Sequence, residues 1–224
     1  MKVWLAALMA VLMAGAAQAA PVTVSYQIAA SGDDAYGASG WGDASGPQLL
    51  WTYGTTARPT YLRWLVDIPA DATVTSAYLK VYQGQPQSIV TKDIQLNALV
   101  DASSFATSKL YGLAVSDTSV TWNYTPIGSW GGIEGTLNTS PDIGALVQAV
   151  VDGAGYAPGS YLGLRGVQAG GSTATYYIHS YDWTDHSQGA ILEVTYDVVP
   201  EPATLGLLGF GALGLVVRRR DRKA

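Results

Sequence analysis

The chain has 224 residues, with 12 Lys and Arg against 17 Asp and Glu, so its formal net charge is −5 at neutral pH. This acidic balance argues against nucleic acid as a partner, because phosphate binding needs clustered basic side chains. The sequence contains no cysteine, which excludes disulfides, thiol catalysis and Cys-based metal sites.

The first nineteen residues have the pattern of a secretory signal peptide. Lys2 precedes an apolar run over residues 3–16, and residues 17–19 (Ala-Gln-Ala) are small where a signal peptidase reads. We predict that signal peptidase cuts after Ala19. Residues 20–198 are then expected to form one domain, since about 180 residues suffice for a core.

The charge of this body differs from that of the whole chain. Residues 20–199 contain fifteen acidic and six basic side chains, which gives the body a net charge of about −9. Such a surface offers little to a polyanionic glycan unless the few basic residues converge.

Alternating apolar and polar residues predict a series of short strands in the body. The clearest are two strands within residues 60–82, separated by a turn at residues 69–72. In the second strand Ala77, Leu79 and Val81 are predicted to point inward. Further strands are predicted within residues 21–30, 94–100, 120–122, 161–165, 175–181 and 191–198. The Gly-rich stretch at residues 31–47 is predicted to be a long loop.

One short helix is predicted after these first strands. Ser140 can cap it, Pro141 suits its first position and Gly153 ends it, with apolar residues at helical spacing between them. About eight or nine strands with Gly- and Pro-rich turns and so little helix predict two packed antiparallel sheets. The expected fold is therefore an all-β, jelly-roll-like antiparallel β-sandwich with one short helix.

The chain ends in a segment of three parts at residues 199–224. Pro200 and Pro202 flank Glu201 and interrupt both helix and sheet. Residues 203–217 carry no charge and are expected to form a hydrophobic helix of about 22 Å, at roughly 1.5 Å per residue. This length is somewhat short of the roughly 30 Å hydrocarbon core of a membrane.

A basic cluster follows this apolar segment and is expected to stay on the cytoplasmic side as a membrane stop signal: Arg218, Arg219 and Arg220. The whole order, beginning with Val199-Pro200-Glu201-Pro202, closely resembles the PEP-CTERM sorting signal. The resemblance implies a Gram-negative bacterium that makes exopolysaccharide. It also implies transient insertion into the inner membrane, followed by cleavage by an exosortase near the Pro-Glu-Pro and release to the cell surface or extracellular matrix. A permanent single-span anchor is the alternative interpretation.

Two stretches of the body carry a second resemblance. LRWLVDIP at residues 62–69 and ATVTSAYLKVY at residues 72–82 resemble the core of the DNRLRE (disaggregatase-related) domains. The similarity continues in the family's order at residues 120–123, 130–132, 142–151, 161–164 and 192–196. It implies a β-sandwich of secreted and cell-surface proteins, some of which bind carbohydrate beside polysaccharide-degrading enzymes. At residues 179–182 the chain has His-Ser-Tyr-Asp in place of the family's arginine-centred terminal segment.

The aromatic composition points to a carbohydrate-binding surface. Tyr and Trp total 21 residues against two Phe, and these side chains combine an apolar face with a polar tip. Flat sugar faces stack on such rings. Trp64 and Trp122 are predicted to pack in the core. The candidates for sugar contact, in or beside predicted loops, are Trp41, Trp51, Tyr53, Tyr124, Trp130 and Trp183.

Few residues suit catalysis or cofactor binding. The chain has two histidines and no G-x-S-x-G turn, so we predict a protein without enzymatic activity. No cofactor is expected apart from calcium, for which the candidate ligands are Asp33, Asp34 and Asp43. A second cluster is formed by His179, Asp182, Asp185 and His186. It contains two types of side chain that can bind a transition metal, so a metal site there is an alternative to a purely structural role.

These observations support three hypotheses about function. The favoured one is a non-catalytic exported protein of the surface or matrix that binds exopolysaccharide, because it combines the sorting tail with a body that resembles a sugar-binding module. The second is a structural or adhesive surface protein that contacts proteins. The third is a polysaccharide-cleaving enzyme.

Overall fold

The computed structural model describes residues 20–38, 41–46, 48–52, 58–84, 91–103, 105, 110–125, 135–171 and 175–198. The predicted signal peptide, the sorting motif at residues 199–202, the hydrophobic helix at residues 203–217 and the arginines at residues 218–220 lie outside these residues. In the part of the chain that is described, no helix is long and apolar enough to cross a membrane.

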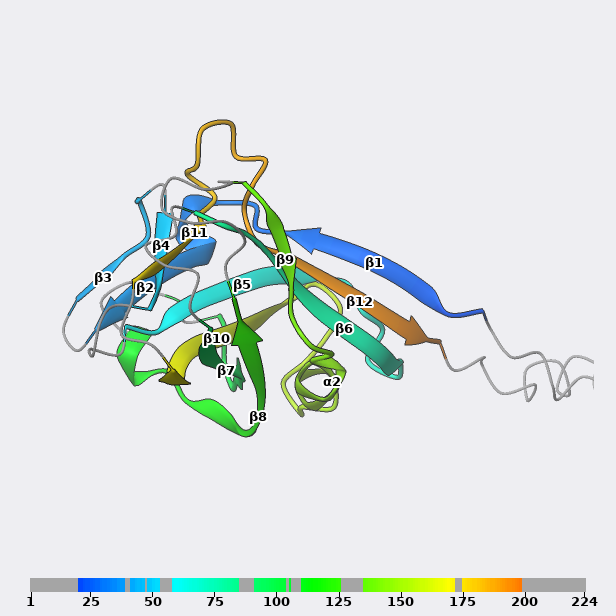
Figure 1. Ribbon diagram of the computed structural model, residues 1–224. Coiled ribbons are helices and arrows are strands. Elements are labelled where there is room, and N and C mark those ends of the chain that lie inside the picture. The colour runs from blue at the N-terminus through cyan, green and yellow to red at the C-terminus, as the bar shows by residue number, and fades with distance from the viewer. Residues whose placement is uncertain are drawn as a thin grey trace, which may run out of the picture.

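The described residues form twelve strands, two short 3-10 helices and one α-helix (Figure 1). The strands are β1 (Val22–Gln27), β2 (Asp34–Ala38), β3 (Trp41–Asp43), β4 (Gln48–Thr52), β5 (Thr60–Val66), β6 (Thr73–Tyr82), β7 (Lys92–Leu99), β8 (Val115–Tyr124), β9 (Leu137–Thr139), β10 (Ser160–Gly171), β11 (Tyr176–His179) and β12 (Ile191–Asp197). The helices are η2 (Ser31–Asp33), η3 (Leu110–Gly112) and α2 (Gly144–Val151).

All strand pairs are antiparallel. One sheet has the order β1-β12-β6-β9, a second has the order β3-β2-β5-β10-β7-β8, and β4 pairs with β11 in a third. The predicted all-β sandwich with one short helix is confirmed.

The core lies between the two larger sheets and is built from the inward residues of each strand. In β6, Ala77, Leu79 and Val81 are buried as predicted. Across from them, Trp64 of β5 is buried, and its indole Nε1 donates a hydrogen bond to the carbonyl of Ala190 at 3.0 Å. Burial of such alternating apolar residues is the main stabilising contribution to the fold.

The two strands within residues 60–82 are not paired with each other. β5 belongs to the six-stranded sheet and β6 to the four-stranded sheet, so the segment between them crosses from one sheet to the other. Ile68 and Ala72 of this segment are buried in the core. Alternation predicts each strand but does not determine its partner, which here comes from distant parts of the chain.

The expectation of a long loop at residues 31–47 is wrong. This segment contains β2 and β3, and β2 adds to the edge of β5 with Ala35 opposite Tyr61 and Tyr36 opposite Thr60. Its small residues have low intrinsic strand propensity, but pairing with a formed sheet edge overrides that preference.

The helix starts later than predicted, because the predicted cap has another role. The hydroxyl of Ser140 accepts a hydrogen bond from the backbone N–H of Leu79 at 2.9 Å, which ties this segment to β6. Asp142 Oδ1 instead accepts from the first helical N–H, that of Gly144, at 2.7 Å and from the N–H of Ala77 at 2.9 Å. One carboxylate therefore joins the start of α2 to β6.

A second, smaller core covers the outer face of the six-stranded sheet. A Cβ atom at Gly163 of β10 would lie 2.6 Å from Leu99 Cδ1 and 2.8 Å from Ala102 Cβ, so the absence of a side chain lets the segment after β7 lie directly on the sheet. Beside it, Arg63 Nε contacts Asp33 Oδ1 at 2.8 Å.

Candidate functional site

The loop at residues 180–190 joins β11 to β12 and projects from one end of the molecule, where it is the gold loop at the top of Figure 1. Within it, two aromatic residues each stack on a histidine. We call this segment the 180–190 loop.

The first stack pairs Trp183 with His179, the last residue of β11. The ring centroids lie 3.9 Å apart and the ring planes differ by 10°. His179 is 1% exposed, and its Nδ1 is in hydrogen-bond contact with Gln188 Oε1. Trp183 is only half-buried. Because the imidazole beneath it is buried, the accessible part of the indole is the part turned away from His179.

The second stack pairs Tyr181 with His186, with centroids 4.4 Å apart and planes that differ by 15°. His186 Nδ1 lies 2.7 Å from the carbonyl oxygen of Tyr181, so Nδ1 must carry the proton. His186 has a φ of 63° and Thr184 a φ of 30°. Residues other than glycine rarely adopt such angles, and surrounding contacts must stabilise them.

Hydrogen bonds attach the base of the loop to the segment 31–46. Asp34 Oδ2 accepts from the backbone N–H of Tyr181 at 2.7 Å, and the hydroxyl of Ser31 donates to Asp182 Oδ2 at 2.7 Å. The hydroxyl of Ser180 donates to the carbonyl of Gly46 at 2.6 Å. The loop is thus held by polar contacts with a part of the chain more than 130 residues away.

Asp34 is fully buried at this junction. Its Oδ1 has no hydrogen-bond partner among the described residues. Removal from water raises the pKa of this carboxyl to about 7, with smaller contributions in the same direction from Asp182 and Asp33, while the hydrogen bond from Tyr181 opposes the shift.

The structure does not bring the predicted metal ligands together. Asp33 pairs with Arg63, Asp34 bonds to Tyr181, and Asp43 Oδ1 accepts from the N–H of Ser45 at 2.9 Å. Within the described ranges, no three His, Cys, Asp or Glu side chains are placed to hold a metal ion. Neither the calcium interpretation nor the transition-metal interpretation gains support, and both histidines of the second cluster stack on aromatic rings.

The predicted sugar-contacting residues have different positions. Tyr124 is 1% exposed and packs edge-on against Trp122 and Tyr176 in the core, so its proposed contact with sugar is corrected. Its position at the end of β8 looked like a loop in the sequence, whereas the strand alternation continues through it. Trp41 and Trp51 fall on β3 and β4, and Tyr53 and Trp130 lie outside the described residues. Trp183 is partly accessible, as its predicted role requires.

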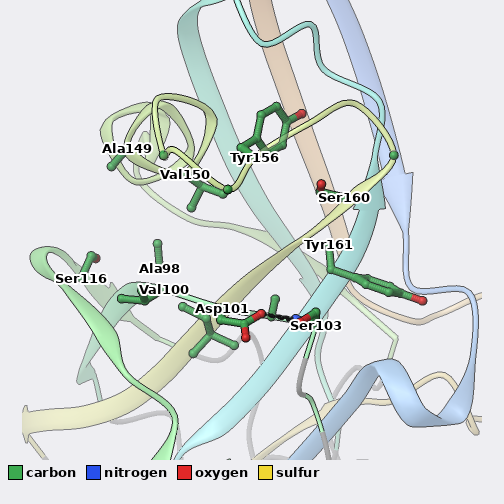
Figure 2. Close-up of a pocket in the computed structure, with 15 residues that line it drawn as sticks. Ala98, Val100, Asp101, Ser103, Ser116, Ala149, Val150, Tyr156, Ser160 and Tyr161 are labelled. Atoms are coloured by element: carbon green, nitrogen blue, oxygen red, sulfur yellow. Dashed lines mark hydrogen bonds between the residues drawn. The ribbon is translucent and has the colours of Figure 1, made fainter.

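A groove of about 490 Å³ lies between the C-terminal half of α2, the start of β10 and the segment 98–103 (Figure 2). Figure 2 shows the Tyr156 and Tyr161 rings pointing away from this space. The hydroxyl of Tyr156 donates to the carbonyl of Ile68 at 2.7 Å, and Arg63 lies 4.2 Å from the centre of the Tyr161 ring. The rest of the lining is mainly aliphatic side chains, glycines and serines, with Asp101 as its one charged residue. Because the two tyrosine rings turn away, the groove presents no aromatic face to a sugar.

The sequence analysis did not anticipate the roles of His179 and Lys92, which are two of the buried polar residues. His179 belongs to the predicted transition-metal cluster, whereas in the structure it supports the Trp183 ring. No sequence signal indicates that stack. Lys92 is fully buried, with Nζ 3.1 Å from Gln168 Oε1, and burial lowers its pKa to about 8. It stands two residues before the inward-facing Ile94, so extending the strand alternation backward would have found it.

Comparisons with known proteins support the C-terminal prediction and not the resemblance of the body. No curated protein sequence matches the chain, and no match supports the DNRLRE-like body. The enzymatically active domain of tailspike protein 4 from bacteriophage CBA120 aligns with 82% of this chain at 12% identity and a TM-score of 0.24. The chain spans 20% of that protein's length, and so low a TM-score does not establish a common fold. Residues 198–220 match the family model of the PEP-CTERM protein-sorting motif. The chain therefore carries at its C-terminus the motif of secreted, exosortase-processed surface proteins.

Proposed function

We propose that this chain is a non-catalytic protein of the cell surface or extracellular matrix of a Gram-negative bacterium, where it associates with exopolysaccharide. The sorting motif supports the first part, since it implies exosortase as the processing partner. In this proposal the hydrophobic segment at residues 203–217 and Arg218 to Arg220 hold the chain transiently in the inner membrane, and exosortase cuts near Pro200-Glu201-Pro202.

The stack of Trp183 on His179 is the observation that carries the sugar-binding part. A partly exposed indole with one face fixed on a buried ring loses little conformational freedom when a ligand binds. Its apolar face suits the apolar face of a sugar ring, while nearby carboxylates and hydroxyls of the loop suit sugar hydroxyls.

The position of the loop agrees with this role. The 180–190 loop precedes the first residue of β12, and the sorting tail follows the last residue of that strand. Seven residues of strand separate them by roughly 20 Å, at about 3.3 Å per residue. While the tail is at the membrane, the loop is therefore at the far end of β12.

Affinity electrophoresis of the full-length protein in gels that contain the producer's exopolysaccharide tests the proposal. We expect the wild type to be retarded and Trp183→Ala to bind at least about tenfold more weakly, as when an aromatic residue at the centre of a binding surface is removed. Tyr78→Ala is the matched control, because Tyr78 is a half-buried aromatic residue of β6. Its retardation should equal that of the wild type. If the wild type is not retarded and binds nothing on a glycan array, the sugar-binding part is wrong.

The mass of the protein recovered from cells and medium tests the sorting part independently. We expect a chain that begins after Ala19 and ends near the Pro-Glu-Pro motif. Recovery of the intact chain from the cytosol, with its terminal arginines, would contradict export.

A further inference from the structure

The charged side chains of the 180–190 loop are all acidic. The loop carries Asp182 and Asp185 and contains no Lys or Arg. These two residues lie one position before and two positions after Trp183, in two consecutive turns closed by hydrogen bonds from the Trp183 N–H to the carbonyl of Ser180 at 3.3 Å and from the His186 N–H to the carbonyl of Trp183 at 2.8 Å. A ligand on the indole is therefore bound close to two acidic residues.

Both carboxylates are held in place by hydrogen bonds. Asp182 Oδ2 accepts from the hydroxyl of Ser31 at 2.7 Å, and Asp185 Oδ1 accepts from the hydroxyl of Ser187 at 2.6 Å and from its N–H at 3.1 Å. The bonds from Ser187 lower the pKa of the exposed Asp185 carboxyl, so it is ionised at neutral pH. The loop therefore presents fixed negative charge beside Trp183.

Arg63, a basic side chain next to the base of the loop, does not cancel this charge. Arg63 Nε contacts Asp33 Oδ1 at 2.8 Å, and its guanidinium packs over the rings of Tyr161 and Phe105 on the outer face of the sheet. The net charge of the body, about −9, has the same sign as the loop. Local and overall charge thus act on a ligand in the same direction.

We propose that the Trp183 site binds neutral or amine-bearing sugars, such as unacetylated hexosamine units, and rejects uronates and other anionic sugars. This inference rests on the proposed function and names the ligand class of the same site. A sugar carboxylate on the indole meets two like charges, whereas a protonated sugar amine meets two opposite charges. A neutral sugar is bound by stacking and hydrogen bonds alone.

Three soluble oligosaccharides of equal length test the proposal with the full-length protein by calorimetry: a glucosamine tetramer with free amines, a neutral glucose tetramer and a uronate tetramer. We expect the amine-bearing tetramer to bind most tightly, the neutral one more weakly and the uronate not measurably. Raising the salt concentration should weaken only the amine-bearing tetramer.

Two variants separate this site from the general attraction of an acidic protein. Asp185→Asn should weaken binding of the glucosamine tetramer by about two- to fivefold and leave binding of the glucose tetramer unchanged. Asp117→Asn, which removes an exposed carboxylate from β8, should leave both unchanged. Trp183→Ala should weaken binding of both by at least about tenfold.

Each outcome has one meaning. If neither the tetramers nor the producer's exopolysaccharide bind, the sugar-binding part of the proposed function is wrong. If the uronate binds as tightly as the others and Trp183→Ala removes that binding, the sugar site stands and its proposed specificity is wrong. If Trp183→Ala binds the glucosamine tetramer as well as the wild type does, the attraction is general and the proposed specificity is also wrong.

Discussion

The interior between the two large sheets and the junction of the 180–190 loop with the segment 31–46 are held by opposite kinds of contact. Between the sheets, apolar side chains such as Leu79, Leu162 and Leu192 are fully buried. At the junction, the fully buried residues include Asp34 and Ser180, and both make hydrogen bonds to distant backbone groups. Apolar burial is non-directional and scales with area, whereas each polar contact depends on one partner and on its protonation. The two regions should therefore respond differently to substitution and to pH.

The largest effect is expected from a cavity in the apolar interior. Trp64→Ala should lower the free energy of unfolding by about 3–5 kcal/mol, because it removes a buried indole. It also leaves the carbonyl of Ala190 without the hydrogen bond from Trp64 Nε1. Urea denaturation at pH 7 measures the change. Leu65→Ala on the same strand is the control, since Leu65 is 59% exposed and should change stability by less than about 1 kcal/mol. Equal losses for the two variants would contradict the placement of the core.

A smaller effect, dependent on pH, is expected at the polar junction. The pKa of Asp34 is raised from 3.8 to about 7 in the folded protein. Between about pH 4 and pH 7 the Asp34 carboxyl is protonated in the folded protein and ionised in the unfolded chain. Its contribution to the free energy of unfolding is therefore fully present below about pH 4 and is lost as the pH rises through 7. With about 1.4 kcal/mol per pKa unit, the loss is at most on the order of 4 kcal/mol.

Asp34→Asn should remove this loss. The amide oxygen can still accept the hydrogen bond from Tyr181, and the side chain no longer ionises. We expect the variant to be more stable than the wild type at pH 7.5 and to differ least from it at pH 4, as measured by denaturation at a series of pH values. Asp71→Asn, at an exposed position, should follow the wild type throughout. If Asp34→Asn kept the pH dependence of the wild type, the buried carboxyl would not be its source.

The same contrast separates what the sequence predicts from what it does not. Alternation predicted β6 and its inward residues Ala77, Leu79 and Val81, because one buried face imposes a period of two on any strand. It also predicted the sandwich as a class. These features depend on residue type and local order alone.

Partners distant in the chain were not predicted. The sequence contains no signal that places β5 and β6 in different sheets, or that adds the Gly-rich β2 to the edge of β5. The candidate site follows the same rule. The aromatic residue type and the predicted loop single out Trp183. The stack on His179 depends on the conformation of the loop, and the hydrogen bond that the Tyr181 N–H donates to Asp34 forms only when distant segments meet.

The smallest effect should come from a polar contact near the surface. Comparing it with the buried junction shows whether burial or polarity makes the junction sensitive to substitution. Lys80 Nζ of β6 lies 2.7 Å from Glu193 Oε2 of β12, and both side chains remain partly exposed. Water already solvates such a pair, so its coupling energy should be about 0.2–1 kcal/mol and should decrease in high salt. A double-mutant cycle with Lys80→Ala and Glu193→Ala measures it. A coupling energy above about 2 kcal/mol would show that polar pairs stabilise this sandwich whether or not they are buried. The interior and the junction would then differ because of polarity alone, and burial would not be part of the cause.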